Sequence, residues 1–180
     1  MASGRAFGPS ESRILLRAVR TAEDLTGRFY CIPGREWPRY PYELRTRSHG
    51  PGPAAPAFAD VVRLVARRPR APASGPAEMW RIRLRDDAIL SAVRERDDGI
   101  DLFPLLLYVL THELVHVVRF GSRTARFHAS LDARKVEEAR VHGITERILE
   151  AHGEPSVSRV VRLYGRRSGE PGLADCVSPK

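Results

Sequence analysis

The chain has 180 residues, which is enough for one domain with its own core and too few for two domains of ordinary size. Its net charge of +8 comes from arginines that are spread along the chain, since Lys135 and Lys180 are the only lysines. The densest group of arginines, at 63–70, has no aromatic residues between them that could stack on bases. The charge is therefore not typical of a nucleic-acid surface. Cys31 and Cys176 form no C-x-x-C pair, and neither a secretory signal nor a run of roughly 18 uncharged apolar residues is present, so we expect a cytoplasmic protein with no membrane partner.

The first predicted helix follows an expected flexible tail at 1–9, and Ser10 is its expected N-cap. Its apolar stripe consists of Ile14, Leu15, Ala18, Val19, Ala22 and Leu25. The segment 31–47 is rich in proline and aromatic residues, so we expect an irregular path that ends in a short strand at 42–45. Glycine and proline then predict a loop at 49–56.

The middle of the chain is predicted to contain a short helix over 58–66, because apolar residues recur there at helical spacing. These residues are Phe58, Val61, Val62 and Val65. A proline-rich loop is expected at 67–77. In MWRIRLR, at 79–85, apolar residues and arginines alternate, which predicts a strand. A short helix is expected after it over 88–96.

The C-terminal half is expected to be helical. Ser130 is placed to cap a helix that ends at Gly153. Its outward residues are Lys135, Arg140 and Arg147, and its inward residues are Val141, Ile144 and Ile148. A short element at 158–164 precedes a polar, flexible tail at 165–180. Together the elements predict one α+β domain over 10–164, mainly helical, with a small sheet before the central apolar helix.

That apolar helix runs from Asp101, a suitable N-cap, to Gly121, a suitable stop. His112 and His116 lie four residues apart on it, so both imidazoles point the same way and can reach one metal ion. Glu113 projects about 100° round the helix from His112, close enough to hold a water molecule on that ion. This is the H-E-x-x-H arrangement, in which two histidines bind zinc and the glutamate is a general base.

The apolar flanks of the motif strengthen the metal hypothesis. They place the helix in the core, where an unpaired glutamate between two histidines is costly to bury. A metal ion would compensate all three side chains. A catalytic zinc site also needs a third protein ligand, and the downstream candidates are His128, Glu137, Glu138 and His142. The two glutamates lie on either side of the inward stripe of their helix, so geometry alone does not choose between them.

The sequence HELVH, followed about twenty residues later by EEARVH on a second helix, resembles the gluzincins, the thermolysin-like zinc metallopeptidases, and most closely their minimal members. In that group the third zinc ligand is a glutamate on the second helix, and a polar residue four positions later often supports a zinc-binding histidine. The resemblance therefore implies Glu138, with His142 four positions on, whereas Glu137 would have Val141 there.

The resemblance covers roughly residues 80–150 and implies a zincin-like fold, in which an edge strand of the sheet holds an extended substrate. The predicted strand at 79–85 would be that strand or its neighbour. The longer metzincin motif is not matched, because Ser122 stands where its third histidine would be.

Motif and resemblance together predict a zinc-dependent metallopeptidase that acts on a peptide or protein substrate. One Zn²⁺ per chain would be held by His112, His116 and Glu138, and Glu113 would take a proton from a metal-activated water. The residues considered for stabilising the oxyanion are Tyr108, His128, His142 and Tyr164. Two other interpretations stay open: a catalytically silent zincin-like metal-binding or regulatory module, and a basic nucleic-acid-associated protein with an accidental motif.

Overall fold

The computed structural model describes residues 5–47, 57–66, 77–94 and 99–165. In chain order the elements are α1 (Pro9–Phe29), the 3-10 helix η1 (Gly34–Arg39), β1 (Tyr42–Arg45), β2 (Ala59–Ala66), β3 (Ala77–Leu84), α2 (Asp86–Arg94), α3 (Leu102–Gly121), α4 (Leu131–His152) and α5 (Pro155–Tyr164). The predicted fold class is confirmed, because the fold is α+β and mainly helical, with a small sheet that precedes α3.

Four predicted segments lie wholly or partly outside the described residues, namely the tails 1–9 and 165–180 and the loops 49–56 and 67–77. The first helix begins earlier than expected, since Gly8 and not Ser10 is its N-cap residue. The Gly8 N–H donates to the carboxylate of Glu11 at 2.9 Å, which satisfies a backbone donor at the helix start. The predicted apolar stripe of α1 does pack into the core.

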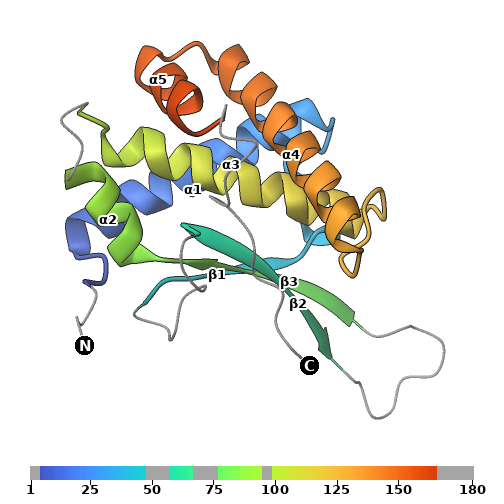
Figure 1. The fold of residues 1–180 in the computed structure, drawn as a ribbon. Helices are drawn as coiled ribbons and strands as arrows, with labels where there is room; N and C mark the ends of the chain where they lie inside the picture. The colour runs from blue at the N-terminus through green and yellow to red at the C-terminus, as the bar shows by residue number, and fades with distance from the viewer. Residues whose placement is uncertain (1–4, 48–56, 67–76, 95–98, 166–180) are drawn as a thin grey trace.

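The sheet has the strand order β1-β3-β2, with β1 parallel and β2 antiparallel to the central strand β3. The helices lie on one side of the sheet, and α3 runs through the middle of the helical layer (Figure 1). Trp80, Ile82 and Leu84 of β3 are buried on the helical side, as the alternation predicted. The strand at 79–85 is therefore the neighbour of an edge strand rather than an edge strand itself.

The prediction of a helix over 58–66 is wrong, because these residues form strand β2. Val61 lies opposite Ile82 of β3 and packs on the core, whereas Asp60 lies opposite Arg83. Arg83 Nε donates to Asp60 Oδ1 at 2.8 Å. A run of this length fits both a helical and an alternating pattern, and pairing along the whole of β3 decides in favour of the strand.

Helix α3 is the most buried element of the fold, and it contacts α1, α2, α4, α5 and β2. By length and composition it is apolar enough to cross a membrane, but 89% of its apolar window is buried inside the protein. Asp101 is the N-cap residue, as predicted, although its side chain makes no capping hydrogen bond. Gly121 is the last helical residue, and a Cβ there would approach the ring of Tyr40 to 2.8 Å. Close packing therefore explains this glycine.

Helix α4 has the predicted ends, with the Ser130 hydroxyl accepting from Ala133 N at 3.3 Å and Gly153 in the left-handed conformation at φ 73°. The inward residues Val141, Ile144 and Ile148 are buried and form a small cluster with Val115 of α3. The outward residues Lys135, Arg140 and Arg147 are exposed, as predicted. This packing fixes which side of α4 faces the middle of α3.

Candidate metal centre

The H-E-x-x-H residues lie in the middle of α3, where its environment is most apolar. His112, Glu113 and His116 have exposed fractions of 0%, 1% and 7%. The imidazole rings of His112 and His116 have centroids 4.9 Å apart, so the four-residue spacing does bring them together on one face. The helix thus presents two imidazoles side by side in a dry interior.

Glu138 of α4 approaches both histidines. Its Oε1 lies 3.0 Å from His112 Nε2, and its Oε2 lies 3.2 Å from His116 Nε2. One ligand atom from each of the three residues can be chosen so that all lie within 4.8 Å of one another. Ligands at the bond lengths of a tetrahedral zinc site are separated by roughly 3.3 Å. The side chains therefore fit the size of a single metal ion.

Several polar atoms of the site are buried and have no hydrogen-bond partner among the described residues. They are both ring nitrogens of His112, Nδ1 of His116, Oε1 of Glu138 and both carboxyl oxygens of Glu113. His112 Nε2 and Glu138 Oε1 are close but are not aligned as a hydrogen bond. Unpartnered buried polar atoms are rare because they are costly. Converging lone pairs of this kind fit a shared cation.

The protonation states favour metal binding by the two best-defined ligands. Burial lowers the pKa of His112 to about 4, so its imidazole is neutral at pH 7 and offers a lone pair. Burial alone would raise the pKa of Glu138, but His112 and the other two imidazoles around it outweigh burial and hold that pKa below its ordinary range. The set is therefore neutral imidazole with carboxylate, a combination suited to zinc and to several other divalent metals.

Glu113 differs from Glu138 in its electrostatic surroundings. Burial raises the pKa of Glu113 well above its ordinary value, and the nearby charges of Glu138 and Asp60 raise it further. A cation bound between His112 and Glu138 would act in the opposite direction and favour the carboxylate form.

Glu137 faces away from the histidines even though it is adjacent to Glu138. Arg119 of α3 binds it through two nitrogens, Nε to Oε1 and Nη2 to Oε2, the second at 2.9 Å. Both side chains are largely buried. Of the two glutamates that the sequence left open, the structure therefore brings Glu138 to the histidines and Glu137 to Arg119. The ion pair of Arg119 with Glu137 was not predicted from the sequence, although an arginine within the apolar stretch VVRF indicates a buried charge that needs a partner.

His142 lies behind Glu138, one turn further along α4. Its Nε2 is 3.2 Å from Glu138 Oε1, and its Nδ1 is 3.0 Å from the hydroxyl of Tyr108 on α3. Burial is the largest cause that raises the pKa of Tyr108, so the hydroxyl keeps its proton. These contacts link His142 to Glu138 and to Tyr108, whereas the resemblance implied that the residue at this position supports a zinc-binding histidine.

The residues considered for stabilising an oxyanion are in different surroundings. Tyr108 is fully buried and engaged with His142. His128 is exposed on the loop between α3 and α4, where its ring contacts Phe127. Tyr164 is half-buried at the end of α5, with its ring against Phe58 and Tyr108. Tyr108 and His142 thus contact each other, whereas His128 and Tyr164 lie on other elements, and the role stays a prediction for all four residues.

Within the part of the chain that the structure describes, His112, His116 and Glu138 are the one group of three or more His, Cys, Asp and Glu side chains with metal-binding spacing. The geometry thus brings together the three residues that the motif and the resemblance favoured as metal ligands. Comparisons of the chain with protein-family models, with curated proteins and with solved structures find no match.

Proposed function

We propose that this protein is a zinc-dependent peptidase whose metal ion is held by His112, His116 and Glu138. The observation that carries the proposal is the convergence of these three side chains beside a buried and unpartnered Glu113. A histidine pair and a glutamate are the protein ligands of catalytic zinc sites that leave a position open. No acceptor or donor among the described residues competes for the Glu113 carboxyl group.

In this proposal the metal, when bound, supplies Lewis acidity that makes a water molecule a stronger acid and nucleophile. Glu113 would take a proton from the water on a carboxylate oxygen as the water oxygen bonds to the peptide carbonyl carbon, and would pass that proton to the amine nitrogen as the C–N bond breaks. His142 and Tyr108 keep Glu138 oriented, and burial of His112 keeps its imidazole neutral. The apolar flanks of α3 exclude bulk water from the proton transfer.

A substrate site is suggested by β2, which is an edge strand of the sheet and contacts α3. The outer edge of such a strand presents N–H and C=O groups that can pair with an extended peptide. The resemblance to gluzincins implies the same use of an edge strand. We therefore propose that peptide backbone lies along β2 and passes the candidate metal centre.

A second candidate function is a metal-binding module without catalysis. The burial of the site favours it, because His112 and Glu113 have exposed fractions of 0% and 1%, and a peptide must reach them to be cleaved. A fold and a site do not by themselves imply turnover. Activity measurements on the zinc-loaded protein separate the two candidates.

The test is a comparison of purified wild type with Glu113→Gln. We expect about one zinc per chain in both, cleavage of a mixed peptide library by wild type, and loss of cleavage in the variant because amide has no proton-accepting carboxylate. Zinc binding without cleavage by wild type would support the silent module. Wild type that takes up no zinc would falsify both candidates.

A further inference from the structure

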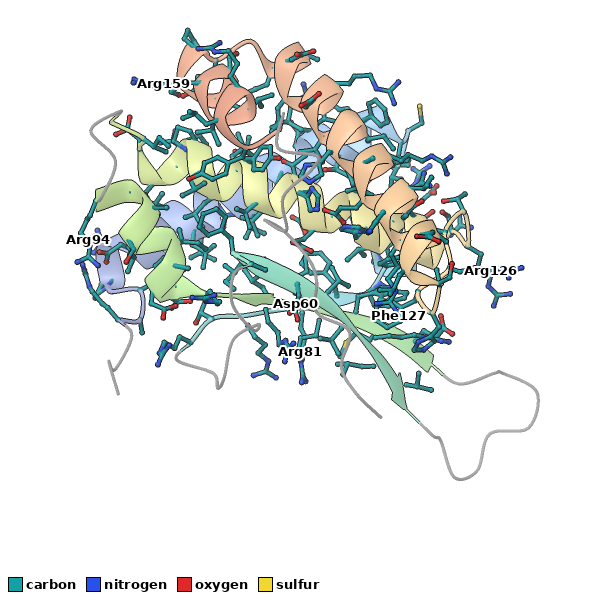
Figure 2. The ribbon with its side chains drawn as sticks, in the orientation of Figure 1. Asp60, Arg81, Arg94, Arg126, Phe127 and Arg159 are labelled. Atoms are coloured by element: carbon teal, nitrogen blue, oxygen red, sulfur yellow. The ribbon has the colours of Figure 1, made fainter. Side chains whose placement is uncertain are left out.

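Next to the candidate metal centre, the structure has a cavity of about 390 Å³ between the ends of β2 and β3 and the loop that joins α3 to α4. Its aromatic floor consists of Trp80, Phe120 and Phe127, whose ring centroids are 5.3–5.5 Å apart. In Figure 2, Phe127 lies between the start of α4 and the sheet. We call this cavity the aromatic pocket.

The aromatic pocket adjoins the candidate metal centre through one ring contact. Phe120 follows His116 by one helical turn, and the two rings are stacked with centroids 5.4 Å apart. Phe120 of the pocket floor thus lies directly next to His116 of the candidate metal centre. Phe120 is therefore in contact with both the pocket and a residue of the candidate metal centre.

The rim of the pocket is positively charged. Arg63 on the rim is paired with Glu78, but Arg123 and Arg126 form no ion pair with any acidic residue that the structure describes. Both are exposed, and Arg126 extends outward at the edge of the molecule (Figure 2). Two guanidinium groups above an aromatic floor complement a carboxylate that is attached to an apolar body.

The loop that carries these arginines is held in place by the C-terminal end of α3. The carbonyl oxygen of Arg119 accepts from Ala125 N, Ser122 Oγ and Thr124 Oγ1 at 3.1–3.3 Å. Arg123 has φ 59°, a left-handed conformation that costs a non-glycine residue free energy. A glycine would relieve that strain, so the presence of arginine at this position is consistent with a use for its side chain.

We propose that the aromatic pocket binds an acidic side chain, aspartate or glutamate, of the peptide substrate, with an adjoining apolar side chain on the aromatic floor. Arg123 and Arg126 bind the carboxylate, and Phe120 and Phe127, which are half-buried and pack on the buried Trp80, contact the apolar group. The assignment rests on the proposed function and adds a substrate class to it, namely peptides in which an acidic residue adjoins an apolar one.

The test measures binding apart from cleavage. Two pools of dye-labelled heptapeptides are titrated against zinc-loaded Glu113→Gln by fluorescence anisotropy. Every peptide contains one Leu or Phe, and the pools differ only in that the acidic pool also contains two Glu and the neutral pool two Gln. We expect the acidic pool to bind about fivefold more tightly. In the same background, Arg123→Gly together with Arg126→Gln should bring the ratio to about one. Arg123→Gly keeps the fold because it relieves the left-handed strain.

The matched control removes two exposed arginines far from the pocket, with Arg94→Gln and Arg159→Gln on α2 and α5 (Figure 2). This control variant should keep the fivefold preference for the acidic pool. Loss of the preference in the control would mean that it arises from the net charge of the protein, and would overturn the proposal. Equal binding of both pools to the parent would overturn it as well. Amidated copies of the acidic pool should bind equally well; loss of binding would mean that the pocket takes a terminal carboxylate instead.

The two proposals can fail separately. Wild type that cleaves both pools at the same rate would leave the peptidase standing and remove the acidic preference. Wild type that cleaves neither pool, while the acidic preference persists in binding, would remove the peptidase and leave the pocket as a peptide-binding site.

Discussion

Glu137 and Glu138 are adjacent in the chain, yet they lie in opposite electrostatic surroundings. Glu138 is surrounded by imidazoles, and Glu137 is bound by the guanidinium of Arg119. The difference arises because consecutive helical residues project about 100° apart. Each carboxylate therefore has its own partner, and exchanging their roles would require α4 to rotate about its axis.

The first prediction follows from this separation. Glu138→Gln should weaken zinc binding by more than about 100-fold, beyond the 10–100-fold that partners outside the ligand set contribute. Glu137→Gln should weaken it far less, because its carboxylate contacts only Arg119 and Arg140 among the described residues. Competition with a fluorescent zinc chelator measures both affinities. A larger loss in Glu137→Gln would reverse the ligand assignment.

The second prediction concerns the buried carboxyl group of Glu113 in metal-free protein. Its pKa in the folded protein is raised above the ordinary 4.5, so its contribution to stability is fully present below that value and declines as the pH rises. Glutamine has no such proton. Metal-free Glu113→Gln should therefore gain stability over wild type between pH 5 and pH 7, by up to about 1.4 kcal/mol per pH unit.

Urea unfolding of both metal-free proteins at the two pH values measures this gain, and exposed Glu150→Gln on α4 is the matched control. The control should show no comparable change between pH 5 and pH 7. A stability difference between wild type and Glu113→Gln that stays constant over this range would mean that Glu113 does not hold its proton in the fold.

At the scale of the elements, the pair of Arg119 and Glu137 joins α3 to α4 next to His116 and Glu138. Arg119→Met should lower the free energy of unfolding of metal-free protein by roughly 3 kcal/mol, because it leaves a largely buried carboxylate with only the longer contact to the exposed Arg140. Arg119→Met together with Glu137→Leu should recover most of that loss. Urea unfolding compares the two, and an equal loss in the double variant would contradict the explanation by an unpaired charge.

The elements that the sequence predicted correctly are those whose local signals agree. For α4, a serine cap, an apolar stripe and a terminal glycine all indicate the same helix, and for β3 the alternation of arginine with apolar residues is strict. For β2, the spacing of apolar residues led to the wrong prediction of a helix, because Val61 and Val62 fit a helical stripe as well as a strand. Its identity depends on pairing with β3, which is a tertiary interaction.

The same division applies to the candidate site. Spacing along α3 was enough to predict that His112 and His116 share a face. The choice of Glu138 over Glu137 depends on how α4 is rotated against α3, and that rotation is set by packing of Val141 on Val115 and by Arg119. The aromatic pocket combines a strand, a helix and a loop that are far apart in the sequence, so no local pattern could have predicted it.

At the scale of the whole molecule, the candidate metal centre joins two helices that are both parts of the core. α3 contacts most other elements, whereas α4 contacts α1, α3 and α5. A metal ion held by two residues of α3 and one of α4 would link these two helices. The unfolded chain does not bring the three residues together and so would not form this link. Metal binding should therefore stabilise the entire fold, and not the site alone.

The last prediction is the size of that stabilisation. With free zinc buffered at 100 times its dissociation constant, the folded state gains about 2.7 kcal/mol. For a chain of this length that gain should raise Tm by roughly 5–11 °C relative to chelator-treated protein. Scanning calorimetry measures the shift, and His116→Ala is the control, because it lacks one ligand and should unfold at the same temperature with or without chelator. Wild type that retains zinc but shows no shift would mean that the unfolded chain binds the metal equally well, and the three side chains would then not form a site that depends on the fold.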